Sequence, residues 1–166
     1  MTQPNVGDYF VVHTTGIAAR LIQLGNWSKW NHAGIYLGDG IIIEARPTGV
    51  SLSNINKYTN RPIIWSTGVD APFTEAETEE LRSFALHFVG YKYGVWSIIA
   101  LGFKCLGISL FPAIERAEKE DSVICSQLVA WVWSHMHRKV SHKQHALVRP
   151  KDLALRLSRS GESRSN

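Results

Sequence analysis

The chain has 166 residues, 45% of them hydrophobic and 19% charged, which suits one compact domain and excludes an intrinsically disordered or fibrous protein. Its two cysteines are too few for the disulfide framework of a small secreted scaffold, so we expect at least one free thiol. The first residues lack the basic and apolar regions of a signal peptide, and we therefore expect synthesis and folding in a reducing cytoplasm.

The net charge of +4 is concentrated at one end of the chain. Residues 137–166 hold eight lysines and arginines against two acidic residues, while the rest of the chain is close to neutral. A basic segment favours anionic partners, and nucleic acid, membrane headgroups and the acidic polymers of a cell wall all meet that description. The alternative is a solvated basic face that keeps the protein in solution.

Strand signals occupy the first half of the chain. They lie at residues 9–13, 32–37, 41–45, 50–52 and 62–65. The second and third of these runs flank a glycine-containing turn and predict a β-hairpin, and the set predicts a small, largely antiparallel sheet. Apolar spacing over residues 17–24 predicts a short helix between the first two strands.

Helix signals follow in the second half. Thr74 and Glu77 match a capping box, and apolar residues at helical spacing then continue until Gly90. A second amphipathic helix is predicted to begin near Ser122, and a third segment follows Pro150. Early strands and late helices indicate an α+β domain in which a small antiparallel sheet packs against helices.

We expect one domain over residues 1–157 and a polar, disordered tail over residues 158–166. Residues 94–114 form a nearly continuous apolar run that approaches the length of a membrane span. Lys104 at its centre, the glycines that interrupt it and Pro112 near its end argue against spanning. We expect a buried helix pair or an apolar lip beside the active site, with membrane contact as the alternative.

Cys125 is the first candidate for chemistry. The run from Asp121 to Leu128 places it in the first turn of an amphipathic helix, where unpaired amides and the helix dipole favour a thiolate. The thiolate is the form of cysteine that acts as a nucleophile. The alternative is a small core residue that packs on the apolar stripe of its helix.

A cysteine nucleophile needs a histidine base and an orienting acceptor, and the predicted hairpin offers both. A three-residue loop over 38–40 pairs Gly34 with Glu44, which makes Glu44 a diagonal neighbour of His32 on one face of the sheet. A two-residue loop puts the two side chains on opposite faces. The glycines in the loop favour the three-residue form, so we expect the pair to meet. The alternatives are a His32 bonded to backbone and a solvent-exposed Glu44.

Three motifs in this order carry a resemblance to a family. They are Asn31-His32-Ala33-Gly34-Ile35-Tyr36, then Ile43-Glu44-Ala45, then Ile124-Cys125-Ser126-Gln127-Leu128-Val129. The match extends over about residues 6–155 through Val6-Gly7-Asp8, Gly90-x-x-Tyr93 and Arg149-Pro150-Lys151-Asp152-Leu153. The chain resembles the circularly permuted branch of the NlpC/P60 papain-like superfamily, which includes the lecithin:retinol acyltransferase-like proteins. In that branch the histidine strand precedes the cysteine helix.

The resemblance implies a permuted papain-like fold and a cysteine hydrolase. Cys125 would be the nucleophile at a helix N-terminus, His32 the base and Glu44 the orienting residue. A glutamate as the third member of the triad makes the chain more similar to the bacterial and viral hydrolases of the superfamily. The acyltransferase-like members tend to have histidine at that position. As oxyanion or substrate contacts we name four further candidates: Tyr9, His13, Ser126 and Tyr93.

We expect no cofactor and no metal. Four histidines near the end of the chain look like ligands by number: His135, His137, His142 and His145. However, two helix residues separated by one position lie about 200° apart around the axis, so the first two cannot share a face. No P-loop, dinucleotide fingerprint or zinc-protease motif is present in the sequence.

Three functional hypotheses follow. In the first, the protein cleaves amide bonds as a peptidoglycan stem-peptide endopeptidase or amidase; it has no nucleic-acid partner, and its basic end meets an anionic wall. A lysis or secretion system would then carry it to the cell envelope. The second is a lipid or acyl-ester hydrolase or acyltransferase of the same fold, which the apolar run supports. The third is a non-enzymatic module in which the basic end binds nucleic acid or another partner and Cys125 is merely packed.

Overall fold

The structure, a computed structural model, describes residues 3–15, 28–94 and 122–162. The strands are β1 (Tyr9–Val12), β2 (His32–Gly38), β3 (Ile41–Arg46), β4 (Gly49–Asn54), β5 (Ile63–Trp65), β6 (Lys92–Tyr93) and β7 (Ser122–Val123). The helices are α2 (Glu75–Leu86), α5 (Cys125–His135) and α6 (Pro150–Glu162), with the 3-10 turns η1 (Ile55–Tyr58) and η2 (His145–Leu147).

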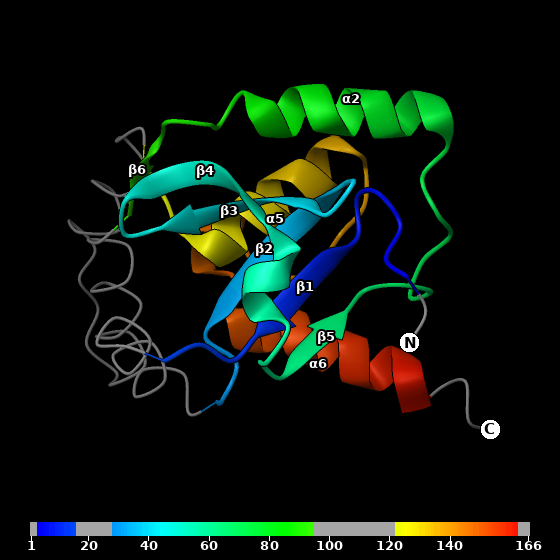
Figure 1. Cartoon of the computed structure of the whole chain (residues 1–166). Coiled ribbons are helices and arrows are strands. Elements are labelled where there is room, and N and C mark those ends of the chain that lie inside the picture. The colour runs from blue at the N-terminus through cyan, green and yellow to red at the C-terminus, as the bar shows by residue number, and fades with distance from the viewer. Residues whose placement is uncertain (1–2, 16–27, 95–121, 163–166) are drawn as a thin grey trace.

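Within the described residues, the main sheet has five strands in the order β4-β3-β2-β1-β5, and all neighbouring pairs are antiparallel. A second, parallel pair joins β6 to β7. Helix α5 packs against β2 and β3, α6 against β1 and β5, and α2 against α5 (Figure 1). This arrangement confirms the prediction of an α+β chain with an antiparallel sheet packed against helices.

Alternating side chains give the sheet two apolar faces. The larger core, which includes α5, contains Tyr9, Val11, Ile35, Ile43 and Leu128. A smaller cluster on the opposite face joins Phe10, Val12 and Ile42 to Tyr58 of η1. Because successive strand residues point to opposite faces, His32 and Glu44 share the face of Ile42 and Tyr58. The turn η1 therefore lies over the two polar residues of the predicted site.

The β2–β3 hairpin has the predicted register but not the predicted loop. Ile35 pairs with Ile43, and one further step of this register places Gly34 opposite Glu44. The loop itself is a two-residue turn at Asp39 and Gly40, both with positive φ, and the register shifts between Tyr36 and Gly38. The extra residue therefore sits in a bulge in β2 instead of in the loop, and a bulge shifts the register by the same amount.

The helices differ from prediction at their ends. Thr74 and Glu77 form the predicted capping box, but α2 ends at Leu86 because the next three residues donate to carbonyls three positions back. The helix predicted to begin near Ser122 begins at Cys125, because Ser122 and Val123 form β7. Residues 122–123 form a strand, and not the first turn of a helix, because they pair with β6, which is distant in sequence.

The predicted disordered tail over 158–166 is wrong for residues 158–162, which continue α6. The preceding turns of this helix are anchored by three buried side chains, those of Leu153, Ala154 and Leu157. The Ser158 hydroxyl donates to the Ala154 carbonyl. A helix anchored in this way extends through polar residues at little cost, because each added residue gains a backbone hydrogen bond. Polar composition alone therefore did not mark the end of the folded chain.

Two expectations lie outside the described residues: the helix over 17–24 and nearly all of the apolar run over 94–114. Among the described helices, none combines the length and the apolar character that a membrane crossing requires.

We predict that Gly34→Ala destabilises the protein by about 1–3 kcal/mol. A Cβ atom on Gly34 would lie 2.8 Å from the Ile43 carbonyl oxygen and 2.8 Å from the Phe10 ring, so the hairpin strands would have to separate. Urea unfolding measures the change. The control is Leu52→Ala, which removes a side chain that is 46% exposed and should change stability by less than about 0.5 kcal/mol. Equal effects of the two substitutions would contradict the close approach at Gly34.

Candidate active site

His32 and Glu44 form a direct hydrogen bond. His32 is the first residue of β2, Glu44 lies in β3, and Nε2 of the imidazole is 2.7 Å from Oε2 of the carboxylate. Glu44 is fully buried and His32 is 9% exposed. The bond follows from the hairpin register, since Gly34 has no side chain to separate the two. The sequence expectation that these residues meet on one face is confirmed.

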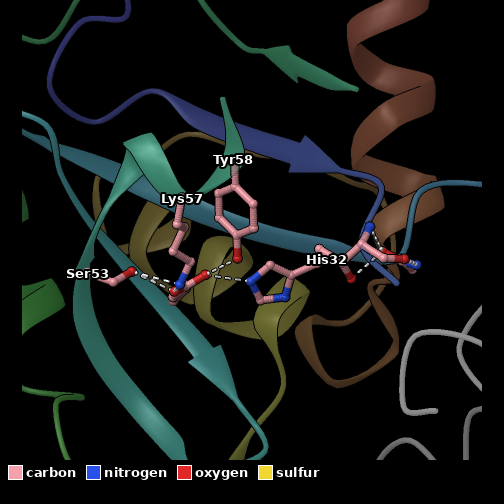
Figure 2. Close-up of polar contacts among 7 residues, drawn as sticks. His32, Ser53, Lys57 and Tyr58 are labelled. Atoms are coloured by element: carbon pink, nitrogen blue, oxygen red, sulfur yellow. Dashed lines mark hydrogen bonds and ion pairs between the residues drawn. The ribbon is translucent and has the colours of Figure 1, made fainter. Parts of the chain in front are cut away.

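Three more side chains bind the Glu44 carboxylate. Ser53 of β4 donates to Oε1 at 2.6 Å, Lys57 of η1 also donates to Oε1, and Tyr58 of η1 donates to Oε2 at 2.7 Å. Figure 2 shows the side chains of Ser53, Lys57, Tyr58 and His32 converging on this carboxylate. Burial alone would raise the pKa of Glu44, but the bond and charge of His32, with Lys57 and Ser53, hold it far below its ordinary value. Glu44 is therefore a buried, ionised acceptor.

Ser53, Lys57 and Tyr58 were missed by the sequence analysis. Lys57 and Tyr58 reach Glu44 because η1 turns back over the sheet after β4, and the Asn54 side chain caps this turn by accepting from the Asn56 amide at 2.9 Å. An asparagine-rich turn was a usable local signal. The direction in which the turn folds back was not readable, because it depends on contacts with the sheet.

Cys125 is the first residue of α5 and is 1% exposed. Ile124 occupies the N-cap position, where its side chain offers no oxygen to the amides of the first turn. The Gln127 side chain instead accepts from the Ile124 amide at 3.0 Å. The amides at this end of the helix, and the helix dipole, place partial positive charge beside Cys125.

Cys125 affects the protonation of His32. Burial lowers the pKa of His32, but the interactions with Cys125 and Glu44 outweigh it and raise this pKa from 6.5 to about 9. Since Nε2 of the imidazole is bonded to Glu44, Nδ1 is the ring nitrogen that remains for the thiol. The imidazole of His32 is thus bonded to Glu44, and its pKa also responds to Cys125.

Tyr93 is the further candidate that the structure brings near Cys125. It lies in β6, pairs with Val123 and is partly buried. Burial first, and then the charge of Cys125, raise the pKa of Tyr93, so its hydroxyl stays protonated and can donate a hydrogen bond. Its proximity depends on the parallel β6–β7 pair, which delivers Tyr93 and the start of α5 to the same place.

The other three candidates bond elsewhere. The fully buried Tyr9 donates to the Leu153 carbonyl at 3.4 Å, and burial raises its pKa to about 12. The Ser126 hydroxyl is buried and donates to the Val148 carbonyl at 2.6 Å. His13 lies beyond the end of β1, with Nδ1 2.8 Å from the Lys29 carbonyl oxygen. These contacts connect Tyr9 and Ser126 to the C-terminal segments and His13 to the loop before β2, and none of them is directed at Cys125.

Among the histidines near the end of the chain, His135 contacts residues of α2. His135 stacks on Phe84 with a centroid distance of 3.8 Å and lies 3.1 Å from the Glu80 carboxylate. In the described part of the chain, no three His, Cys, Asp or Glu side chains are grouped so that they could hold a metal ion.

We predict that His32 titrates with a pKa near 9 and that Glu44→Gln lowers this pKa by about one unit or more, because the substitution removes the negative charge beside the imidazolium. Since folding raises the pKa, the interaction stabilises the protein fully below about pH 6.5, and its contribution is lost as pH rises through about 9. NMR titration measures the His32 pKa in the wild type and in Glu44→Gln, and the His32 signals are assigned by their absence from His32→Ala. A wild-type value near 6.5 would contradict the geometry.

Comparisons with known proteins give a structural neighbour but no family. One similar solved structure is that of a metalloprotein, YiiX from Escherichia coli O157:H7, described also as DUF1105. It aligns with a TM-score of 0.59 and 17% sequence identity, over 86% of this chain and 72% of that chain. No family model and no curated protein matches the sequence. A likeness at this level of identity shows a shared fold.

Proposed function

We propose that the protein is a cysteine hydrolase that cleaves amide bonds by acyl transfer through Cys125, His32 and Glu44. The observation that carries the proposal is the bond between one ring nitrogen of His32 and a buried carboxylate. It is supported by Cys125, at a helix N-terminus, which raises the pKa of the imidazole. A nucleophile, a base and an orienting acceptor in this order form the arrangement that activates a thiol for attack.

The reaction runs in two halves. The Cys125 thiolate attacks the substrate carbonyl, and the resulting oxyanion collapses to a thioester while the His32 imidazolium gives its proton to the leaving amine. Water then attacks the thioester, His32 accepts a proton from that water, and the acid and the free thiolate–imidazolium pair are restored. Glu44 keeps the imidazole in the orientation that both halves need and stabilises its charged form.

The oxyanion needs preorganised donors. The backbone amide of Cys125 is one candidate, because the N-terminus of α5 directs its unpaired amides to this side. The Tyr93 hydroxyl is the second candidate, since it lies near Cys125 and remains protonated. Donors of this kind act most strongly where water is excluded.

The fold supports a permuted papain-like arrangement as part of the proposal. The strand that carries His32 precedes, in the sequence, the helix that begins with Cys125. That strand belongs to the antiparallel five-stranded sheet. YiiX is described as a metalloprotein, but the residues around Glu44 do not fit a metal ion. The two carboxylate oxygens already accept four donors, and one of these is the Lys57 ammonium, whose charge opposes a cation. No step is therefore assigned to a metal.

Peptidoglycan stem peptides are the proposed substrates, with an anionic wall contact through the basic C-terminal segment. Much of that segment also serves the fold. Lys143 and Arg149 both pair with Asp152, and Arg156 pairs with Asp70. The substrate proposal consequently depends more on the Cys125–His32–Glu44 site than on the charge of the C-terminal segment. Acyl esters are the alternative substrates, and the test must include them.

We predict that the protein releases new amino groups from peptidoglycan and that Cys125→Ala and His32→Ala each lower this rate by about 1000-fold or more. The matched control is Cys105→Ser, which removes the other cysteine and should retain activity. Amino-group release and hydrolysis of a series of acyl esters are measured side by side.

Each result decides between the hypotheses. Amide cleavage that needs Cys125 and His32 supports the proposal. Cleavage of esters alone would move the function to an acyl-ester hydrolase of the same fold. No cleavage of either class, together with a Cys125 that iodoacetamide alkylates no faster than a free thiol, would contradict enzymatic function and favour a binding module.

A further inference from the structure

We propose that Lys57 and Tyr58 are positioning residues that fix the Glu44 carboxylate and set the basicity of His32. The inference rests on the proposed function, because it assigns a role to the residues that surround its third member. Both residues lie in η1, a turn that contains none of the candidates named from the sequence.

The four donors are divided between the two oxygens of Glu44. Oε1 accepts from Ser53 and Lys57, and Oε2 accepts from Tyr58 and from Nε2 of His32. The carboxylate cannot rotate toward another orientation without breaking bonds at both oxygens. With Oε1 held by Ser53 and Lys57, Oε2 is left directed at the imidazole.

Lys57 is itself held in place. Besides Glu44, its ammonium donates to the Ser53 hydroxyl at 3.0 Å and lies 5.0 Å from the centre of the Tyr58 ring. Its side chain is 29% exposed, whereas the Glu44 side chain is fully buried. A fixed cation beside a buried carboxylate retains most of its electrostatic effect, because little water screens the pair.

The charges around the carboxylate predict the sign of the effect on His32. Lys57 of η1 and protonated His32 of β2 share one negative charge, while Arg46 of β3 and Cys125 of α5 act on the neighbouring Tyr58 hydroxyl. Lys57 therefore disfavours a second positive charge on His32. Without Lys57 the imidazolium would become the main cation that balances Glu44, and it would hold its proton more strongly.

The backbone of η1 has its own stabilising contacts. The Asn54 side chain accepts from the Asn56 amide, and the Thr59 hydroxyl donates to the Asn56 carbonyl at 2.7 Å. Neither contact involves the side chains of Lys57 or Tyr58. Substitution of these side chains should therefore change the carboxylate while the turn persists.

The test uses Lys57→Met, Lys57→Arg and Tyr58→Phe in the full chain. The control for Lys57 is Lys143→Met, which removes another lysine that pairs with a carboxylate, that of Asp152. The control for Tyr58 is Tyr36→Phe, which removes a hydroxyl that accepts from the Gly40 amide. For each variant we would measure the His32 pKa by NMR, the rate of Cys125 alkylation by iodoacetamide, resolved from Cys105 by peptide mapping, and the melting temperature.

We expect Lys57→Met to raise the His32 pKa by about half to one unit, whereas Glu44→Gln lowers it. Lys57→Arg keeps the positive charge and should leave the His32 pKa at the wild-type value. Tyr58→Phe should raise it by a smaller amount, because the lost hydroxyl leaves Oε2 to the imidazole. The controls should leave it unchanged. An unchanged or lowered His32 pKa in a folded Lys57→Met protein would overturn the inference. A wild-type protein with an ordinary His32 pKa and an unreactive Cys125 would instead overturn the proposed function itself.

Discussion

The structure around the candidate site depends on one buried carboxylate. Glu44 is fully removed from water, and an ionised carboxylate in such a place is strongly unfavourable unless donors replace the water. Side chains from β2, β4 and η1 supply those donors, and two of them carry or can carry positive charge. The position of η1 over the sheet and the orientation of His32 are therefore linked through the same group. Loss of the carboxylate would leave the Lys57 ammonium and the Tyr58 hydroxyl without their shared acceptor.

The two layers of the fold contribute different parts of the proposed chemistry. The hairpin of β2 and β3 aligns His32 with Glu44 through strand register, and that alignment tolerates no side chain at Gly34. Helix α5 brings Cys125 with its unpaired amides, and the β6–β7 pair fixes where this helix begins. A rigid sheet that orients the base and a helix N-terminus whose partial positive charge lies beside the thiol together suit the proposed acyl transfer.

The sequence predicted the parts of the site that depend on local patterns. Alternation and turn glycines were enough to place Glu44 beside His32, although the bulge in β2 was mistaken for a longer loop, and helical spacing placed Cys125 in the first turn of α5. The donors from η1 were missed because a turn of four residues has no periodicity that shows where it folds back. Ser126 and Tyr9 were named as candidates for their chemistry, but their hydroxyls serve packing contacts with distant segments, which only the folded chain reveals.

The central claim is that His32 activates Cys125 for acyl transfer. The most direct test is brief exposure to p-nitrophenyl acetate, acid quenching and peptide mass mapping of wild-type protein and His32→Ala. The account predicts rapid acetylation at Cys125 in the wild type, followed by loss of the acetyl group to water, with both steps greatly slowed in His32→Ala. Acetylation of Cys125 no faster than that of Cys105, or at the same rate in both proteins, would contradict it.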